Sequence, residues 1–347
     1  MRHKALLTVI LIGCWGAGSA AGAVEGGTNV QSREARALKP ASGSRPPSPL
    51  QIKGNHIVNG SGEIVRLKGL MIPEPARLAE EGRYARRLFE AVRATGANVV
   101  RIPVHPQYWA KDPDYIVHHL DPAVRWAGEL GMYLIVDWHS IGNQMTGYAP
   151  EVPELFCHTD AMTTNFWARV AARFSGDPHV ICEIFNEPQN ISAEDWRRCA
   201  NRLVRVIRAQ GARQIIIVGG LNYGRELDWV LREPVTGENI AYASHIFPSH
   251  ARSGWDRDFG NVATRYPVVI TEWGFIDREQ TPNPRDRYLA GDAVTYGAPL
   301  MSYLAGHGIS WVACWFDDQW PPAMFLPGGN GLTSWGKFAT EQLKNNR

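Results

Sequence analysis

Short runs of Val, Ile and Leu alternate with longer amphipathic stretches along most of the chain. A continuous apolar run of this length is typical of a strand that is buried on both faces of a parallel sheet. We expect strands at residues 67–72, 98–103, 133–138, 180–185, 214–218, 241–246, 268–271 and 310–315. Their regular alternation with amphipathic stretches places the chain in the α/β class and predicts a (β/α)8 TIM barrel.

The pattern also predicts an N-terminal β-hairpin ahead of the barrel. Residues 51–57 and 63–71 would form its strands, and the Asn-Gly-Ser-Gly sequence between them would form the turn. No shift of composition divides residues 50–347, so we expect one domain there. Residues 24–49 contain mostly Gly, Ser, Ala, Pro and Arg, a composition typical of a disordered linker.

The first residues have the pattern of an export signal. Arg2 and Lys4 precede an apolar stretch at residues 5–12, and small residues follow as far as Ala23. The apolar stretch is too short for a stable membrane span, so we interpret residues 1–23 as a secretory signal peptide. Cleavage after Ala23 is one route. The other is a bacterial lipobox that ends at Cys14, where acylation would give a lipid anchor.

Two of the expected strands end at a glutamate. Glu187 follows the run at residues 180–185, and Glu272 follows the run at residues 268–271. In a parallel barrel the C-terminal strand ends meet at one mouth, where enzymes of this fold have their active sites. Two carboxylates brought together there can act as proton donor and nucleophile on one substrate. The alternative is that each glutamate only caps a following helix, but their matching contexts favour chemistry.

Other strand ends also have polar or aromatic residues, namely Arg101, His139, His245 and Trp315. An arginine inside an apolar strand is costly to bury without an anionic partner, which a catalytic carboxylate would supply. A single strand-end histidine is more often a satisfied core residue. Polar or aromatic residues at so many strand ends together indicate an active-site mouth.

These motifs resemble glycoside hydrolase family 5, the cellulase family A of retaining (β/α)8 enzymes. The resemblance covers nearly all of the folded chain, from the hairpin to Trp315. Its six motifs are Arg101 in Val-Val-Arg-Ile-Pro, His139 in Asp-Trp-His-Ser, the triplet Asn186-Glu187-Pro188, His245, Glu272 in Thr-Glu-Trp-Gly, and Trp315. The resemblance implies that Glu187 is the acid/base, Glu272 the nucleophile and Asn186 the partner of the sugar 2-hydroxyl.

The chemistry of a retaining glycosidase requires these residue types. It needs a protonated acid at the leaving oxygen and an ionised nucleophile at the anomeric carbon, with carboxyl groups about 5–5.5 Å apart. We expect Arg101 to lie near Glu272 and keep it charged. Partial burial and that negative charge would keep the proton on Glu187.

The chain departs from the family pattern in one place. The family usually has a tyrosine two residues after the histidine of the sixth strand, and its hydroxyl contacts the nucleophile. Here that position is Phe247, which offers no hydroxyl. Tyr223, Tyr296 or a water molecule could substitute, so the tuning of Glu272 is affected rather than its role.

Aromatic side chains provide rigid flat surfaces for sugar rings, and the chain has 13 tryptophans. We expect six of them in or near the mouth loops: Trp109, Trp138, Trp255, Trp315, Trp320 and Trp335. Trp315 is our choice for stacking on the cleaved sugar, and buried packing is an equal alternative for the others. Their spread over several loops indicates an open cleft for a polysaccharide rather than a pocket for one sugar.

The remaining composition narrows the classes of protein. A net charge of +2 with interspersed signs argues against a nucleic-acid partner. Cys182 and Cys314 should be buried in strands, whereas Cys157 and Cys199 could form a disulfide. The scattered histidines fit no zinc-binding spacing, so we expect no metal and no cofactor.

We therefore expect a monomeric, secreted or periplasmic endoglycanase that acts on internal β-1,4 linkages of a glucan. β-Mannan and xyloglucan are the alternative substrates within the family. Outside it, a barrel metal hydrolase would need clustered His and Asp ligands. A protein that only binds carbohydrate would keep the aromatic residues and lose a carboxylate, but both carboxylates are present.

Overall fold

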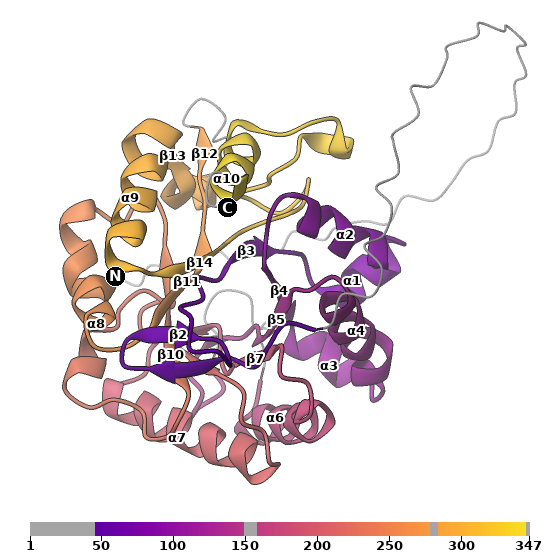
Figure 1. Ribbon diagram of the computed structural model, residues 1–347, viewed down its shortest axis with the longest axis vertical. Coiled ribbons are helices and arrows are strands. Elements are labelled where there is room, and N and C mark those ends of the chain that lie inside the picture. The colour runs from indigo at the N-terminus through magenta and orange to yellow at the C-terminus, as the bar shows by residue number, and fades with distance from the viewer. Residues whose placement is uncertain (1–45, 149–157, 278–283, 345–347) are drawn as a thin grey trace, which may run out of the picture. The chain divides into compact units, whose positions relative to one another are not determined.

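Parallel strands close into an eight-stranded barrel in the spatial order β10-β11-β14-β3-β4-β5-β7-β9. Figure 1 shows the helices around the outside of these strands. The barrel strands are β3 (Lys68–Met71), β4 (Val99–Val104), β5 (Tyr133–Trp138), β7 (Val180–Glu183), β9 (Ile216–Gly219), β10 (Ile240–Ile246), β11 (Val268–Trp273) and β14 (Ser310–Ala313). Every predicted strand is confirmed in type and order, with bounds that differ by at most two residues.

The computed structural model describes residues 46–148, 158–277 and 284–344. Its α-helices are α1 (Pro75–Glu80), α2 (Arg86–Ala94), α3 (Pro106–Lys111), α4 (Asp121–Glu129), α6 (Asp160–Phe174), α7 (Ala193–Ala209), α8 (Asn261–Ala263), α9 (Ala298–His307) and α10 (Ser334–Lys344). The predicted signal peptide, Cys14 and most of the predicted linker lie outside these ranges. Within them, no helix is both long and apolar enough to cross a bilayer.

The N-terminal hairpin is present, but its predicted register is wrong. Strands β1 (Gln51–Lys53) and β2 (His56–Val58) pair antiparallel around a two-residue turn at Gly54 and Asn55. The predicted turn at residues 59–62 does form, yet the chain beyond it makes only an isolated bridge between Ile64 and Val58. The reason is that residues 68–71 pair with barrel strands β4 and β14, so they cannot also extend the hairpin.

The barrel interior consists of an apolar layer followed by a polar one. Val99, Ile135 and Ile181 belong to the apolar cluster on β4, β5 and β7. Alternate residues of a strand face the same side, so the residue two positions later faces the interior as well. On these three strands those residues are Arg101, Asp137 and Glu183, all fully buried. The strand pattern thus places charged groups directly beneath the C-terminal mouth.

The cysteines are all buried in the described part of the chain. Cys182 and Cys314 lie in the barrel, as predicted. Cys199 is a free thiol in α7, so the disulfide considered above is not formed in this structure. Its suggested partner, Cys157, lies outside the described residues.

A buried glutamate, Glu74, follows β3 and caps α1. One carboxylate oxygen accepts a hydrogen bond from the backbone N–H of Arg77 at 2.8 Å, and the other accepts one from the hydroxyl of Tyr115. Burial raises the pKa of Glu74 to about 8, against which these hydrogen bonds act only in part. No salt bridge to this carboxylate is found among the described residues.

Candidate active site

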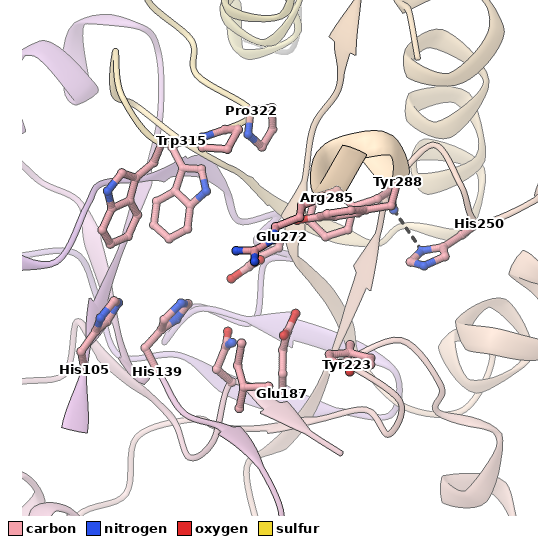
Figure 2. A pocket seen from close by; sticks show the side chains of 15 residues that line it. His105, His139, Glu187, Tyr223, His250, Glu272, Arg285, Tyr288, Trp315 and Pro322 are labelled. Atoms are coloured by element: carbon pink, nitrogen blue, oxygen red, sulfur yellow. Dashed lines mark hydrogen bonds between the residues drawn. The ribbon is translucent and has the colours of Figure 1, made fainter. Parts of the chain in front are cut away.

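The C-terminal ends of the barrel strands surround a cavity of about 610 Å³. Figure 2 shows the two predicted glutamates on opposite sides of it, with tryptophans at one end and tyrosines at the other. The lining residues are His105, His139, Ile141, Asn186, Glu187, Tyr223, Phe247, His250, Glu272, Arg285, Tyr288, Trp315, Trp320, Pro321 and Pro322. The structure thus brings together Glu187, Glu272, Asn186, His139 and Trp315, and it places Arg101 and His245 just beneath.

The backbone after β7 fixes the position of Glu187. The N–H of Asn186 donates to the carbonyl of Trp138 at 3.0 Å, and the N–H of Glu187 donates to the carbonyl of Ser140 at 3.0 Å. The short strand β8 (Glu187–Pro188) then pairs with β6 (Ile141–Gly142). The Asn-Glu-Pro segment is therefore tied to the end of β5, which aims the carboxyl group of Glu187 into the cavity.

Glu272 lies on β11 and is 7% exposed. Nη1 of Arg101 donates to its Oε1 at 2.8 Å, which confirms the expected proximity of the two side chains. One carboxylate oxygen of Glu272 lies within 4.8 Å of one of Glu187. The two carboxyl groups thus face each other without a large gap between them.

Arg101 has more partners than the sequence suggested. Its guanidinium binds both oxygens of Glu183 at 2.7 and 3.1 Å, approaches Asp137 at 3.0 Å and donates to Oδ1 of Asn186 at 2.7 Å. Glu183 and Asp137 were missed as site residues. A signal for them was present in the sequence. The apolar strands at residues 133–138 and 180–185 each contain one carboxylate, and the strand before them contains Arg101, which needs anionic partners when buried.

The shared guanidinium changes the expected electrostatics. Burial tends to lower the pKa of Arg101, but the three surrounding carboxylates raise it above its usual range. Burial raises the pKa of Glu272 above its usual value, while His245 and Arg101 oppose this rise. Burial likewise raises the pKa of Asp137 to about 7. Arg101 acts on the pKa of Glu272 in the expected direction, but its single charge also serves Asp137 and Glu183.

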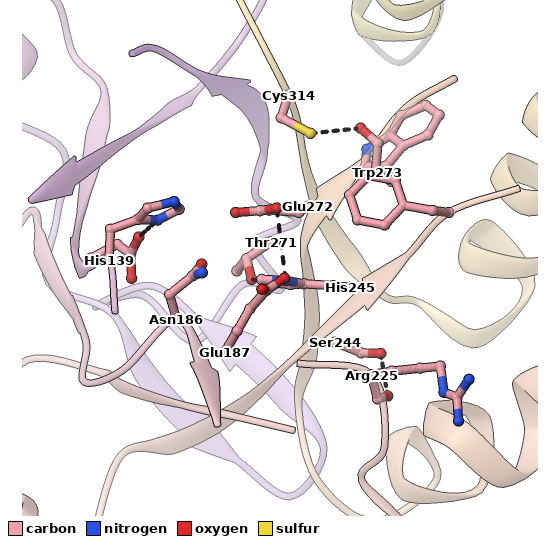
Figure 3. Close-up of polar contacts among 12 residues, drawn as sticks. His139, Asn186, Glu187, Arg225, Ser244, His245, Thr271, Glu272, Trp273 and Cys314 are labelled. Carbon is pink, nitrogen blue, oxygen red and sulfur yellow. Dashed lines mark hydrogen bonds and ion pairs between the residues drawn. The ribbon is translucent and has the colours of Figure 1, made fainter. Parts of the chain in front are cut away.

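His245 connects the two sides of the cavity. Its Nδ1 lies 2.8 Å from Oε1 of Glu187, and its Nε2 lies 3.1 Å from the hydroxyl oxygen of Thr271 (Figure 3). Burial lowers the pKa of His245, so the ring is neutral near neutral pH, although Glu272 opposes the shift. Gly224, at φ +73°, packs so closely that an added Cβ would lie 2.8 Å from the imidazole ring.

Aromatic rings line the other end of the cavity. The rings of His139 and His105 stack at 4.9 Å with 9° between their planes, and Nδ1 of His139 lies 2.6 Å from Asp137. The rings of Trp320 and Trp315 pack edge to face, with their centroids 4.7 Å apart and 84° between their planes. Of the six tryptophans expected near the mouth, only Trp315 and Trp320 line the cavity. The other four are buried in the core: Trp109, Trp138, Trp255 and Trp335.

The structure narrows the choice of residues that could substitute for the missing tyrosine hydroxyl. Tyr296 cannot replace it, because its buried hydroxyl donates to the carbonyl of Ile246. Tyr288 reaches the cavity from the 3-10 helix Pro284–Leu289, and its ring packs at 5.3 Å and 87° against Phe247. No strand pattern could identify this residue, since it comes from a different loop. Tyr223 lines the cavity beside Glu187.

Glu187, His245 and Glu272 are the only His, Cys, Asp or Glu residues in the described part of the chain close enough to hold a metal ion together. The donor atoms that a cation would need already have partners. Nδ1 of His245 contacts Glu187, and Oε1 of Glu272 contacts the guanidinium of Arg101. This donor set suits proton transfer better than metal binding.

Comparison with known proteins agrees with this geometry. The family model for cellulase (glycosyl hydrolase family 5) matches residues 58–318. Endoglucanase A of Butyrivibrio fibrisolvens is 26% identical over 254 residues, which cover 69% of this chain and 54% of that protein. An endoglucanase of Clostridium saccharobutylicum is 24% identical, with 82% of this chain and 60% of that protein covered. The match therefore spans little more than half of these relatives.

Solved structures give a fuller match. The native β-glucanase SdGluc5_26A of Saccharophagus degradans superposes with a TM-score of 0.82 and 29% identity, over 87% of this chain and 94% of that one. The same enzyme has been solved with cellotetraose, and this structure covers 90% of this chain and 99% of that one at a TM-score of 0.82 and 28% identity. With the closed barrel, the paired glutamates and the family-model match over most of its length, the chain belongs to glycosyl hydrolase family 5.

Proposed function

We propose that this protein is a retaining glycoside hydrolase that cleaves internal β-1,4 linkages of a glucan. The observation that carries the proposal is the approach of the Glu187 and Glu272 carboxylate oxygens to within 4.8 Å at the barrel mouth. Retaining glycosidases hold their carboxyl groups about 5–5.5 Å apart, whereas inverting enzymes need about 6.5–9.5 Å to fit a water molecule. The short separation supports a covalent mechanism.

In the first step, a carboxylate oxygen of Glu272 attacks the anomeric carbon, and the bond from that carbon to the leaving oxygen breaks. Glu187 gives its proton to the leaving oxygen, so the shortened chain departs as an alcohol. Arg101 orients the nucleophile through its 2.8 Å contact with Oε1. Asn186 is also held by Arg101, through its Oδ1, so its amide nitrogen can donate to the sugar 2-hydroxyl.

In the second step, water attacks the anomeric carbon of the glycosyl-enzyme. Glu187, now a carboxylate, takes a proton from that water, and the ester bond to Glu272 breaks. Each step inverts the anomeric centre once, so the product keeps the β configuration. Both glutamates return to their starting protonation states.

The substrate assignment rests on the shape of the cleft and on the relatives. Trp315 lies at one end of the cavity, and Tyr223 and Tyr288 lie at the other, with the glutamates between them. Trp320 also lines the cavity and packs against Trp315. Aromatic surfaces on both sides of the cleavage point suit an internal segment of a polysaccharide. Matching relatives are named endoglucanases, and one matching β-glucanase was solved with cellotetraose, which favours a β-glucan over mannan or xyloglucan.

The enzyme must leave the cytoplasm to reach a polymeric glucan. The basic and apolar pattern of residues 1–23 supports such export. Signal peptidase cleavage after Ala23 and acylation at Cys14 are the two routes that fit this pattern. Mass spectrometry of the mature N-terminus would distinguish a free N-terminal residue from a lipidated cysteine. We propose that the exported enzyme acts as a monomer, which light scattering would test.

The decisive test of the mechanism is the stereochemistry of the product. NMR of a cello-oligosaccharide digest should show the β-anomer of the new reducing end first, before mutarotation produces the α-anomer. An α-anomer as the first product would contradict the assignment of Glu272 as nucleophile. Parallel assays on soluble glucan, mannan and xyloglucan should give the highest kcat/KM for glucan.

A further inference from the structure

A hydrogen-bonded chain runs from the buried core of the barrel to Glu187. The hydroxyl of Thr271 donates to Oε1 of Glu183 at 2.8 Å, Nε2 of His245 lies 3.1 Å from the same hydroxyl oxygen, and Nδ1 lies 2.8 Å from Oε1 of Glu187. Glu183, Thr271 and His245 are fully buried. Water therefore has little access to these groups, and the donors and acceptors of the chain keep their roles.

The direction of the chain is set at its buried end. Both oxygens of Glu183 accept hydrogen bonds from Arg101, so this carboxylate acts as an acceptor. A threonine hydroxyl has one proton, and donating it to Glu183 leaves its oxygen only as an acceptor. That oxygen can then be paired with Nε2 of His245 only if Nε2 carries a hydrogen.

A neutral imidazole with its hydrogen on Nε2 has a bare lone pair on Nδ1. The short contact between Nδ1 and Glu187 then requires the hydrogen to come from the carboxyl group. We infer that Thr271, held by Glu183, is a positioning residue that fixes His245 as the Nε2–H tautomer and thereby keeps Glu187 protonated before cleavage. The inference rests on the role proposed above for Glu187 as general acid.

The same arrangement serves the second step of the reaction. After Glu187 has given its proton away, Nδ1 of His245 has no hydrogen to offer the new carboxylate. Glu187 is then left as a base without that compensating donor, and it takes a proton from the attacking water. The sequence alone gave Thr271 no role, because a threonine within an apolar strand is unremarkable.

Titratable and charged groups surround His245 from several strands of the barrel. Glu187 and Glu183 face it from β7 and the segment that follows, and Glu272 faces it from β11 at 3.8 Å. Arg101 on β4, His139 after β5 and His250 after β10 act on it as well. A change at Thr271 leaves all of these groups in place, so it tests the hydrogen-bonded chain itself.

The test compares Thr271→Val, which keeps the side-chain shape, with Thr271→Ser, which keeps the hydroxyl. Positioned acid catalysis contributes about 10²–10⁴-fold, so the valine variant should lose about 10- to 100-fold in kcat/KM on phenyl β-cellobioside. On 2,4-dinitrophenyl β-cellobioside, whose leaving group needs no proton, its loss should be far smaller. The alkaline limb of the phenyl cellobioside pH profile should move to lower pH, and the serine variant should restore it.

Equal losses on the two substrates would show a merely structural role and overturn the inference, as would an unshifted pH profile. Should the valine variant fail to fold, ¹⁵N-histidine NMR of the wild-type protein decides, with His245→Asn used to assign the signal. An Nδ1–H tautomer for His245 would overturn the inference. Failure of the proposed function itself is a separate result, because an α-anomeric first product would appear in the wild-type enzyme.

Discussion

Glu272 contacts a guanidinium that three buried carboxylates share, whereas Glu187 contacts an imidazole that burial keeps neutral. The side of the cleft that holds the proposed nucleophile, Glu272, is thus ionic. The proposed acid, Glu187, contacts a neutral ring, and the hydrogen-bonded chain behind that ring ends at the same ionic cluster through Glu183. We expect these neighbours to give two chemically identical side chains different proton affinities. The groups that would separate the two proposed roles lie one layer below the cavity.

The largest effects should come from the glutamates themselves. Glu272→Gln removes the nucleophile and should lower kcat by about 10⁴-fold or more on every substrate. Glu187→Gln should lose about 10²–10⁴-fold on unactivated substrates and much less on dinitrophenyl cellobioside. Steady-state kinetics on both substrates measure this contrast.

Glu341→Gln, a change at an exposed residue of α10, is the matched control and should be neutral. Azide should partly rescue Glu272→Gly and give an α-glycosyl azide. If both Gln variants were equally impaired on the activated substrate, the proposed distinction between an acid side and a nucleophile side would be wrong.

A second prediction concerns the ionic side. Arg101→Met leaves Asp137, Glu183 and Glu272 without their cation, and removal of one partner of a buried ion pair costs about 3–5 kcal/mol of stability. Because Arg101 lowers the pKa of Glu272, its loss should also move the acid limb of kcat/KM to higher pH. Urea unfolding and pH–rate profiles measure the two effects.

Arg101→Lys keeps one charge but cannot make the paired contact with Glu183, so it should give smaller changes in the same directions. If the methionine variant unfolds, the lysine variant still reports the shift of the acid limb. An acid limb that stays unchanged in the lysine variant, despite reduced stability, would mean that Arg101 does not tune the nucleophile.

The last prediction concerns stability rather than catalysis, and it isolates burial from charge. Glu74 is buried with no salt bridge to any residue that the structure describes, and its pKa of about 8 lies above the usual 4.5. The folded state therefore binds this proton more tightly than the unfolded state does. Stability should fall as pH rises from 4.5 to 8, by at most about 1.4 kcal/mol per pH unit.

Glu74→Gln removes the titrating group and should flatten this slope, which urea unfolding at pH 5, 6.5 and 8 would measure. Glu341→Gln, at the exposed position of α10 named above, is the control and should leave the slope unchanged. An unchanged slope in the Glu74 variant would show that another group is responsible.

The strand pattern was sufficient to predict the barrel, because continuous apolar runs and their spacing are properties of the sequence itself. The same logic brought Glu187, Glu272 and His245 to one mouth. It failed where tertiary pairing decides the outcome, as at the hairpin, whose predicted second strand is used by the barrel. For Trp109 and Trp335 the sequence left a mouth position and buried packing open, and the structure shows that both pack into the core.

The parts of the site that sequence reasoning missed are those defined by contacts across the barrel. Glu183 and Asp137 become site residues only because β4 lies next to β5 and β5 next to β7, which brings both within reach of Arg101. Tyr288 arrives from a loop with no apolar periodicity. In each case the residue type was visible, but its partner could be identified only from the arrangement of the strands.

Gly224 has a practical consequence for engineering. The segment at residues 221–226 borders the cleft through Tyr223, and it would be a natural target for random mutagenesis aimed at new substrates. Any side chain at Gly224 would press on the imidazole of His245 and also require an unfavourable backbone conformation at φ +73°. A combinatorial library that varies Tyr223 while keeping Gly224 fixed would therefore contain many more active members than one that varies the whole segment.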